Sequence, residues 1–230
     1  MGIPNSRLTL ARRTLSSSQM TSDIAKTPGL LRMRLLIFTL ASSSFACLLG
    51  TFYGLWAMKT FACFAYLPAA LALAVLAWSK RGTLPAHWIV QGALAGIVAA
   101  LAYDLYRLPF VLNGAPLFNV FPRFGELLLG GTEPRWLVQG LGWTYHFSNG
   151  AALGVMFLAA LSRPSPARLF FGGGCWALLV ELLLLLTPYT SFFGIPFDRR
   201  FVALTLTAHL VFGLALGLWL RARASSLARL

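Results

Sequence analysis

Four side chains that can bind or release a proton lie inside apolar stretches of this chain of 230 residues. They are the carboxylates of Asp104 and Glu181 and the imidazoles of His146 and His209. Carboxylates and imidazoles carry protons, pair with each other and bind metal ions. An unpaired charge at the centre of a lipid bilayer costs about 2.5–3.5 kcal/mol on insertion scales, so such groups are usually paired and often functional. These four residues are therefore the first candidates for a site.

The elements that must position these residues are long apolar helices. The chain is 58% hydrophobic and 11% charged, with a mean hydropathy of +0.73. A bilayer core of about 30 Å needs roughly 20 apolar residues per helix. The sequence therefore predicts an all-α membrane protein with six transmembrane helices. The six stretches are residues 35–58, 61–78, 88–106, 141–161, 169–187 and 201–220.

Basic residues are distributed unevenly between the two ends of these helices. If the N-terminus is cytoplasmic, most of the 19 Lys and Arg residues lie inside. Positive charge collects on the cytoplasmic side of membrane proteins, so both termini are expected inside. The net charge of +13 is expected to meet anionic lipid headgroups rather than nucleic acid. The residues expected outside are Lys59, Arg107, Arg123, Arg135, Arg199 and Arg200.

Three regions follow from these patterns. Residues 1–33 are basic, rich in Ser and Thr and poor in acids, which predicts a disordered cytoplasmic leader. Residues 34–80 are expected to form a leading pair of transmembrane helices. Residues 88–220 are expected to form a core of four helices that contains all of the candidate residues.

Small residues recur at intervals of four on the core helices, and on each helix one of the four ionisable residues continues the row. Gly and Ala at this spacing let helix backbones approach closely, so these faces are expected to meet protein rather than lipid. The ionisable side chains should then point into the bundle. The glycines predicted to pack helices are Gly92, Gly96, Gly150, Gly154, Gly173, Gly213 and Gly217.

The order of these features is the same in residues 88–161 and 169–220. In each segment a helix with small residues and an acid is followed by a proline and an aromatic residue, and then by a helix with the pattern His-x3-Gly-x3-Gly. This order predicts a duplicated two-helix unit. Because each unit has an even number of spans, the two copies would run parallel and be related by an axis along the membrane normal.

The tandem His-x3-Gly-x3-Gly helices, which begin that pattern at His146 and His209, resemble those of bacterial polytopic inner-membrane proteins grouped as domains of unknown function. The resemblance covers roughly residues 88–220. It implies a multi-pass protein of the bacterial inner (plasma) membrane, and it implies no particular activity.

The predicted topology places all four ionisable residues in the outer half of the membrane. The sequence therefore predicts one cluster that binds a ligand or an ion, formed by Asp104, His146, Glu181 and His209 with Asn149 beside them. The two acids differ in the partners that the sequence offers them. Asp104 precedes Arg107 by three residues and could form a structural ion pair with it. Glu181 has no local partner, so it must pair with another helix or be protonated.

Several functions are compatible with such a cluster. The acid–histidine contacts could only hold helices together, in a structural or assembly partner of a membrane complex. They could instead form a binding or transport site for a small solute or ion, with proton exchange at the imidazoles. Two histidines and two carboxylates also suit a metal ion, and haem b between the two histidines would make a membrane oxidoreductase. No catalytic motif is present, so among the functional alternatives the sequence favours transport over catalysis, without a cofactor. The sequence also allows a homo-oligomer.

The longest connection, residues 107–140, is too apolar for a free loop and too short to span a bilayer. It is expected to form an interfacial or re-entrant segment over the cluster. Phe118, Phe121 and Phe124 are expected to dip into lipid from this segment.

Overall fold

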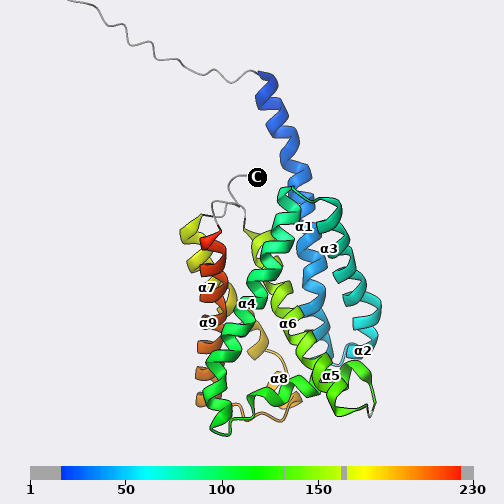
Figure 1. Cartoon of the computed structure of the whole chain (residues 1–230), viewed down its shortest axis with the longest axis vertical. Coiled ribbons are helices and arrows are strands. Elements are labelled where there is room, and N and C mark those ends of the chain that lie inside the picture. The colour runs from blue at the N-terminus through cyan, green and yellow to red at the C-terminus, as the bar shows by residue number, and fades with distance from the viewer. Residues whose placement is uncertain (1–16, 132, 162–164, 224–230) are drawn as a thin grey trace, which may run out of the picture. The chain divides into compact units, whose positions relative to one another are not determined.

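The structure is a computed structural model that describes residues 17–131, 133–161 and 165–223 (Figure 1). Every regular element of these residues is a helix, so the predicted all-α class is confirmed. The chain divides into two compact units, residues 1–33 and 34–230, which are described separately.

In the first unit, residues 17–33 are helical because helix α1 (Ser17–Phe52) begins at Ser17. The structure thus places this part of the predicted leader in a helix, and residues 1–16 lie outside the described residues. The physical reason is that adding residues to an existing helix avoids the cost of nucleation. The apolar stretch after residue 34 supplies that helix.

The second unit continues α1 and adds the remaining helices. The helix predicted at 35–58 ends at Phe52, because the chain turns at Gly54 with φ of +67°. Glycine adopts this left-handed conformation without the steric cost of a Cβ atom. The other elements are α2 (Met58–Phe61), the π-helix η1 (Ala62–Tyr66), α3 (Leu67–Ser79), α4 (Leu84–Leu112), the 3-10 helix η2 (Leu117–Asn119), α5 (Val120–Leu129), α6 (Arg135–Ala160), α7 (Pro166–Leu185), α8 (Tyr189–Phe192) and α9 (Arg199–Ala222).

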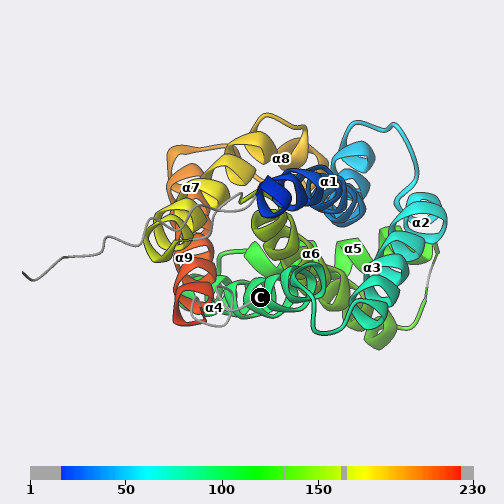
Figure 2. The same cartoon turned by 90° about the horizontal axis from the view of Figure 1, so that it is seen from above.

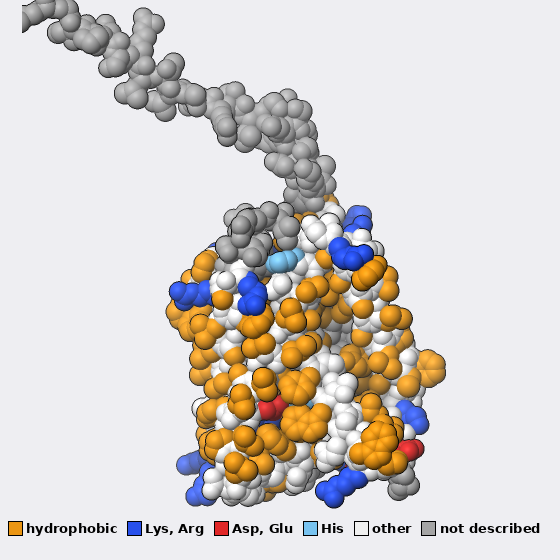
Figure 3. All heavy atoms as spheres, viewed as in Figure 1, with side chains coloured by type: hydrophobic (Ala, Val, Ile, Leu, Met, Phe, Trp, Pro, Cys, Tyr) orange, Lys and Arg blue, Asp and Glu red, His pale blue; other side chains and the backbone are white. Residues whose placement is uncertain are grey.

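Five helical segments are long and apolar enough to cross a membrane, which fits a multi-pass membrane protein. Figure 3 shows hydrophobic side chains over the middle of one face of residues 34–230 and basic side chains near its two ends. Helix α6 is not among the five, although it is 26 residues long, because polar residues dilute its apolar ones. The five are Pro28–Phe52, Met58–Ser79, Leu84–Leu112, Pro166–Leu185 and Arg199–Ala222.

Within the second unit, α4 packs against α6 on one side and against α9 on another, and α9 packs against α7 (Figure 2). The colours in Figure 1 show that α4 and α7 run in one direction and α6 and α9 in the other. Helix α3 lies at the edge of this unit, and its side chains are mostly exposed. A membrane around the bundle would cover these exposed apolar side chains with lipid.

The glycine rows lie where helices touch. A Cβ atom on Gly96 of α4 would collide with the backbone of Gly150 on α6. A Cβ atom on Gly173 of α7 would collide in the same way with the carbonyl of Gly213 on α9. Gly92 similarly meets Gly154, and Gly217 meets the backbone of Leu169 and Phe170. These contacts bring each acid-bearing helix against a histidine-bearing helix.

The connection from α4 to α6 is mostly helical and packs inward. Helix α4 continues through Pro109 to Leu112, and α5 then lies against α6. Phe121 and Phe124 are 1% and 7% exposed, so the prediction that they dip into lipid is wrong. The reason is that Gly125 and Gly142 remove the side chains that would separate α5 from α6, as a Cβ on Gly142 would collide with the carbonyl of Phe121. Phe118 is partly buried and packs against the same core.

Candidate functional site

The first acid–histidine pair joins α4 to α6. The Oδ2 atom of Asp104 lies 2.8 Å from Nε2 of His146. Asp104 is only 6% exposed, and its Oδ1 atom lies 3.6 Å from Nη1 of Arg107. The carboxylate is therefore shared between an imidazole at hydrogen-bonding distance and a guanidinium slightly farther away. Asp104 therefore contacts both a histidine of the predicted cluster and Arg107, the two kinds of partner that the sequence suggested for it.

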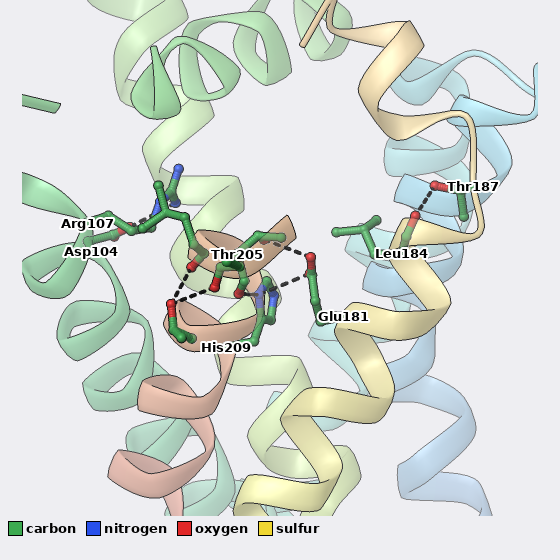
Figure 4. Close-up of polar contacts among 10 residues, drawn as sticks. Asp104, Arg107, Glu181, Leu184, Thr187, Thr205 and His209 are labelled. Atoms are coloured by element: carbon green, nitrogen blue, oxygen red, sulfur yellow. Dashed lines mark hydrogen bonds and ion pairs between the residues drawn. The ribbon is translucent and has the colours of Figure 1, made fainter. Parts of the chain in front are cut away.

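The second pair joins α7 to α9. Glu181 is 1% exposed, and its Oε2 atom lies 3.0 Å from Nδ1 of His209. The hydroxyl of Thr205 donates a hydrogen bond of 2.7 Å to the other oxygen, Oε1. Figure 4 shows Thr205 and His209 on α9 facing Glu181 on α7. The sequence left two alternatives for Glu181, a partner on another helix or protonation. The structure gives it partners on another helix, α9.

The geometry around His209 leaves one carboxylate oxygen free. Nδ1 of His209 also lies 3.0 Å from the backbone carbonyl of Thr205, one turn earlier on the same helix. An N–H on Nδ1 that points at this carbonyl is not aligned with Glu181. Accordingly, Oε2 of Glu181 is buried without a hydrogen bond to the described residues. A buried carboxylate oxygen in this state is costly unless it gains a proton or another donor.

The two pairs have the same construction. On each acid-bearing helix the acid follows a glycine by eight residues and an alanine by four, and on each partner helix the histidine precedes its contact glycine by four. The glycine meets the glycine and the acid meets the histidine in both cases. Positions are called equivalent below when they stand at the same distance from the acid or from the histidine.

A cavity of about 90 Å³ lies between the two pairs. Five sets of equivalent positions line it, which places it between the two halves of the core. They are Ala100 and Ala177, Tyr103 and Val180, Arg107 and Leu184, His146 and His209, and Asn149 and Phe212. Helices α5, α7 and α8 complete the wall with residues that include Phe121, Trp176 and Tyr189.

The polar groups of the wall come mainly from one half of the core. Arg107 is 5% exposed, donates to the backbone carbonyl of Leu117, and has its guanidinium carbon 4.6 Å from the ring centre of Tyr103. The equivalent positions of Arg107, Tyr103 and Asn149 in the other half are all apolar. The cavity is therefore more polar on the side of α4 and α6, whereas on the side of α7 and α9 the polar groups in its wall are those of His209 and Trp176.

Asn149 and Tyr145 differ in what they do. The side-chain oxygen of Asn149 accepts a hydrogen bond of 3.0 Å from the hydroxyl of Ser44 on α1, and Asn149 lines the cavity. Tyr145 is buried and donates to the backbone carbonyl of Ser44. Tyr145 does not line the cavity, so it fastens α6 to α1.

The four ionisable residues form two pairs rather than one set of four ligands. In the described part of the chain, no three His, Cys, Asp or Glu side chains are grouped so that they could hold one metal ion. The ring of Tyr103 packs against both imidazoles, with centre-to-centre distances of 4.9 Å to His209 and 6.2 Å to His146. The pairs therefore give the metal alternative no set of three or more protein ligands among the described residues.

Three residues of the site were missed or undervalued by sequence reasoning. Arg107 lines the cavity in addition to pairing with Asp104. Thr205, one helical turn before His209, reaches the same carboxylate, and the spacing of four on α9 could have indicated it. Trp176 lines the cavity, and its indole Nε1 is buried without a hydrogen bond to the described residues. No local pattern distinguishes this tryptophan.

Tyr189 of α8 lies outside the membrane-spanning helices and lines the cavity. Burial raises the pKa of its phenol above the ordinary value, so Tyr189 contributes a neutral hydroxyl to the wall.

The chain matches no family model, no curated protein and no solved structure.

Proposed function

We propose that the chain crosses the bacterial inner membrane six times, with both termini in the cytoplasm and α6 as the sixth span. At about 1.5 Å per residue, the 26 residues of α6 extend about 39 Å, which exceeds a bilayer core of about 30 Å. Three of its polar side chains have partners on other helices: His146 pairs with Asp104, Asn149 with Ser44, and Ser148 accepts a hydrogen bond of 2.6 Å from Tyr66. Polar residues paired in this way are tolerated within a membrane.

The core of this protein is proposed to be two copies of a two-helix unit, α4 with α6 and α7 with α9. The matching glycine–glycine and acid–histidine contacts support the duplication. Helices α4 and α7 run in the same direction, so the axis that relates the copies lies along the membrane normal. The cavity then lies on this axis, where transporters built from repeats commonly hold their substrates.

We propose that this cavity binds a small polar solute or ion, which the protein moves across the membrane with proton exchange at the acid–histidine pairs. The observation that carries the proposal is the cavity itself, lined by both imidazoles and by Arg107 inside an apolar bundle. Helices need only paired polar groups to hold together, and packing alone does not require open space between those pairs. A mostly apolar cavity with a few convergent polar groups is the arrangement expected of a binding site.

Proteoliposomes test this function. Purified protein is reconstituted with a pH-sensitive dye inside, and a panel of inorganic ions, small amines, small carboxylates and neutral solutes is added outside. At least one solute is expected to drive a change of internal pH, and Glu181→Gln is expected to abolish it. The matched control is Glu126→Gln, the same substitution at an exposed carboxylate that pairs with Arg123.

Flux that is unchanged in Glu181→Gln, or the absence of flux with every member of the panel, would contradict the proposal. A purely structural role predicts a different pattern. Glu181→Gln would then lower thermal stability in detergent, and no solute would raise the stability of the unsubstituted protein.

A further inference from the structure

We infer that the solute is a small monocarboxylate with a short apolar tail, and that it enters the cavity together with a proton. This inference rests on the proposed function, because it names the substrate class of the same cavity. It comes from three observations: the donors on the wall, the position of the two acids, and the difference between the two halves of the lining.

The donors on the wall point to an anion. Arg107 brings a guanidinium that is nearly buried and whose distance of 3.6 Å to Asp104 exceeds that of a normal hydrogen bond. Its planar group can bind a carboxylate through two parallel hydrogen bonds. Trp176 brings an indole N–H that is a donor only and has no partner among the described residues. Among the described residues that line the cavity, none carries a carboxylate.

The two acids lie behind the imidazoles rather than in the wall. Asp104 holds Nε2 of His146, and Glu181 lies beside Nδ1 of His209. In each case the other ring nitrogen makes no hydrogen bond to the described residues. When the ring is protonated, that second nitrogen also carries an N–H donor. It is then positive, like Arg107, and can donate to the same anionic solute.

The charge balance requires a proton to accompany an anion. The ionisable groups at the cavity are Asp104 and Arg107 from α4, His146 from α6, Glu181 from α7 and His209 from α9, with the neutral phenols of Tyr103 and Tyr189. With both acids ionised and both imidazoles neutral, these groups carry one net negative charge. A bound carboxylate would add a second buried negative charge without a counter-charge. Uptake of at least one proton by an imidazole or by Glu181 removes this penalty.

The apolar half of the wall selects the other end of the solute. Opposite Arg107, Tyr103 and Asn149 lie their equivalents Leu184, Val180 and Phe212. A carboxylate at Arg107 would direct its remaining atoms toward these three apolar side chains. A cavity of about 90 Å³ has room for only a few heavy atoms, so the tail must be short. Acetate and propionate have these properties.

Calorimetric titration of the purified protein in detergent with acetate and propionate tests the inference. Acetamide, a neutral molecule of the same shape as acetate, and ethylammonium, a cation of similar size, serve as comparison solutes. Titrations in two buffers with different heats of ionisation count the protons taken up. We expect binding of the carboxylates with uptake of about one proton and stronger binding at lower pH, and no binding of acetamide or ethylammonium.

Two substitutions identify the donors. Arg107→Gln is expected to weaken carboxylate binding at least about tenfold, the usual scale of a lost hydrogen bond between charged groups. The control is Arg123→Gln, the same change at an exposed arginine. If Arg107→Gln fails to fold, Trp176→Phe decides the matter. That change keeps an apolar ring, removes the indole donor, and is expected to weaken binding several-fold.

The outcomes separate this inference from the proposed function. Equal binding of acetamide and acetate would overturn the carboxylate assignment, as would full affinity in a folded Arg107→Gln variant or in Trp176→Phe. Flux that depends on Glu181 but is driven only by a cation or a neutral solute would leave the proposed function standing and overturn the carboxylate assignment. The absence of binding and flux with every solute would overturn both.

Discussion

Thr205 and His209, one helical turn apart on α9, reach the same carboxylate of Glu181 on α7. The hydroxyl of Thr205 donates to Oε1 at 2.7 Å, and Nδ1 of His209 lies 3.0 Å from Oε2. The backbone carbonyl of Thr205 also lies 3.0 Å from Nδ1 of His209. Thr205 therefore orients both members of the pair, and its loss should disturb the acid and the imidazole together.

Thr205→Val removes this hydroxyl and keeps the shape of the side chain. The substitution leaves a buried carboxylate oxygen without its donor, so we expect the free energy of unfolding to fall by about 1–3 kcal/mol. Unfolding in a detergent titration measures the change. Thr207→Val is the control, because the hydroxyl of Thr207 is exposed: it donates to carbonyls of its own helix and accepts an exposed hydrogen bond from Tyr106. Equal stability of the two variants would contradict the role given to Thr205.

Gly173→Ala tests the close contact of α7 with α9. The added Cβ atom would collide with the carbonyl of Gly213, so the helices must separate, and we expect a loss of about 1–3 kcal/mol. Gly174→Ala is the matched control on the next residue, where a Cβ atom would meet only side-chain atoms at 3.5 Å or more. A thermal scan in detergent should show a lower Tm for the first variant only. A similar loss in Gly174→Ala would show that α7 tolerates no alanine here for another reason.

Asp104 and Arg107 form a buried pair, and a double-mutant cycle measures their coupling. Asp104→Asn leaves the guanidinium without its counter-charge, so we expect a loss of about 3–5 kcal/mol. The double variant Asp104→Asn/Arg107→Gln removes both charges and should be more stable than the sum of the single variants implies. Strictly additive losses would mean that the distance of 3.6 Å carries no interaction and that His146 alone satisfies the acid.

Cysteine labelling tests the six-span topology. Single cysteines are placed at Gly131, between α5 and α6, and at Arg81, between α3 and α4, in a background without Cys47, Cys63 and Cys175. A membrane-impermeant maleimide applied to intact bacterial cells is expected to label the cysteine at Gly131. The cysteine at position 81 should react only after the membrane is permeabilised. If both react in intact cells, or neither does, α6 and the direction of the bundle must be assigned differently.

Much of the fold follows from local patterns in the sequence. The interval of four along Gly92, Gly96, Ala100 and Asp104 puts these residues on one face of any α-helix, so it assigns them to one face without knowledge of the partner. Five of the apolar stretches also give helices that could cross a membrane, because length and hydropathy are local quantities. The ends of those helices are less predictable. The turn at Gly54 and the inward packing of α5 depend on which backbones meet.

The site shows the same boundary between local and long-range information. The sequence names Asp104, His146, Glu181 and His209 as polar residues in apolar helices, and it cannot say which acid meets which histidine. Their division into two pairs is set by the contacts of α4 with α6 and of α7 with α9. Trp176 could not be recognised at all, because an indole beside a glycine-rich row is indistinguishable from an aromatic residue that faces lipid.

Several equivalent positions in the cavity wall carry different residues in the two halves, which two identical units could not provide. An assembly of two identical two-helix units would place the same residue on both sides of the axis. Two copies of Arg107 would then face each other across a space of about 90 Å³ and repel, whereas two copies of Leu184 would leave no guanidinium to bind an anion. Joining the units in one chain removes this restriction. Each half can then change independently, and the solute is held in a single orientation rather than in two equal ones.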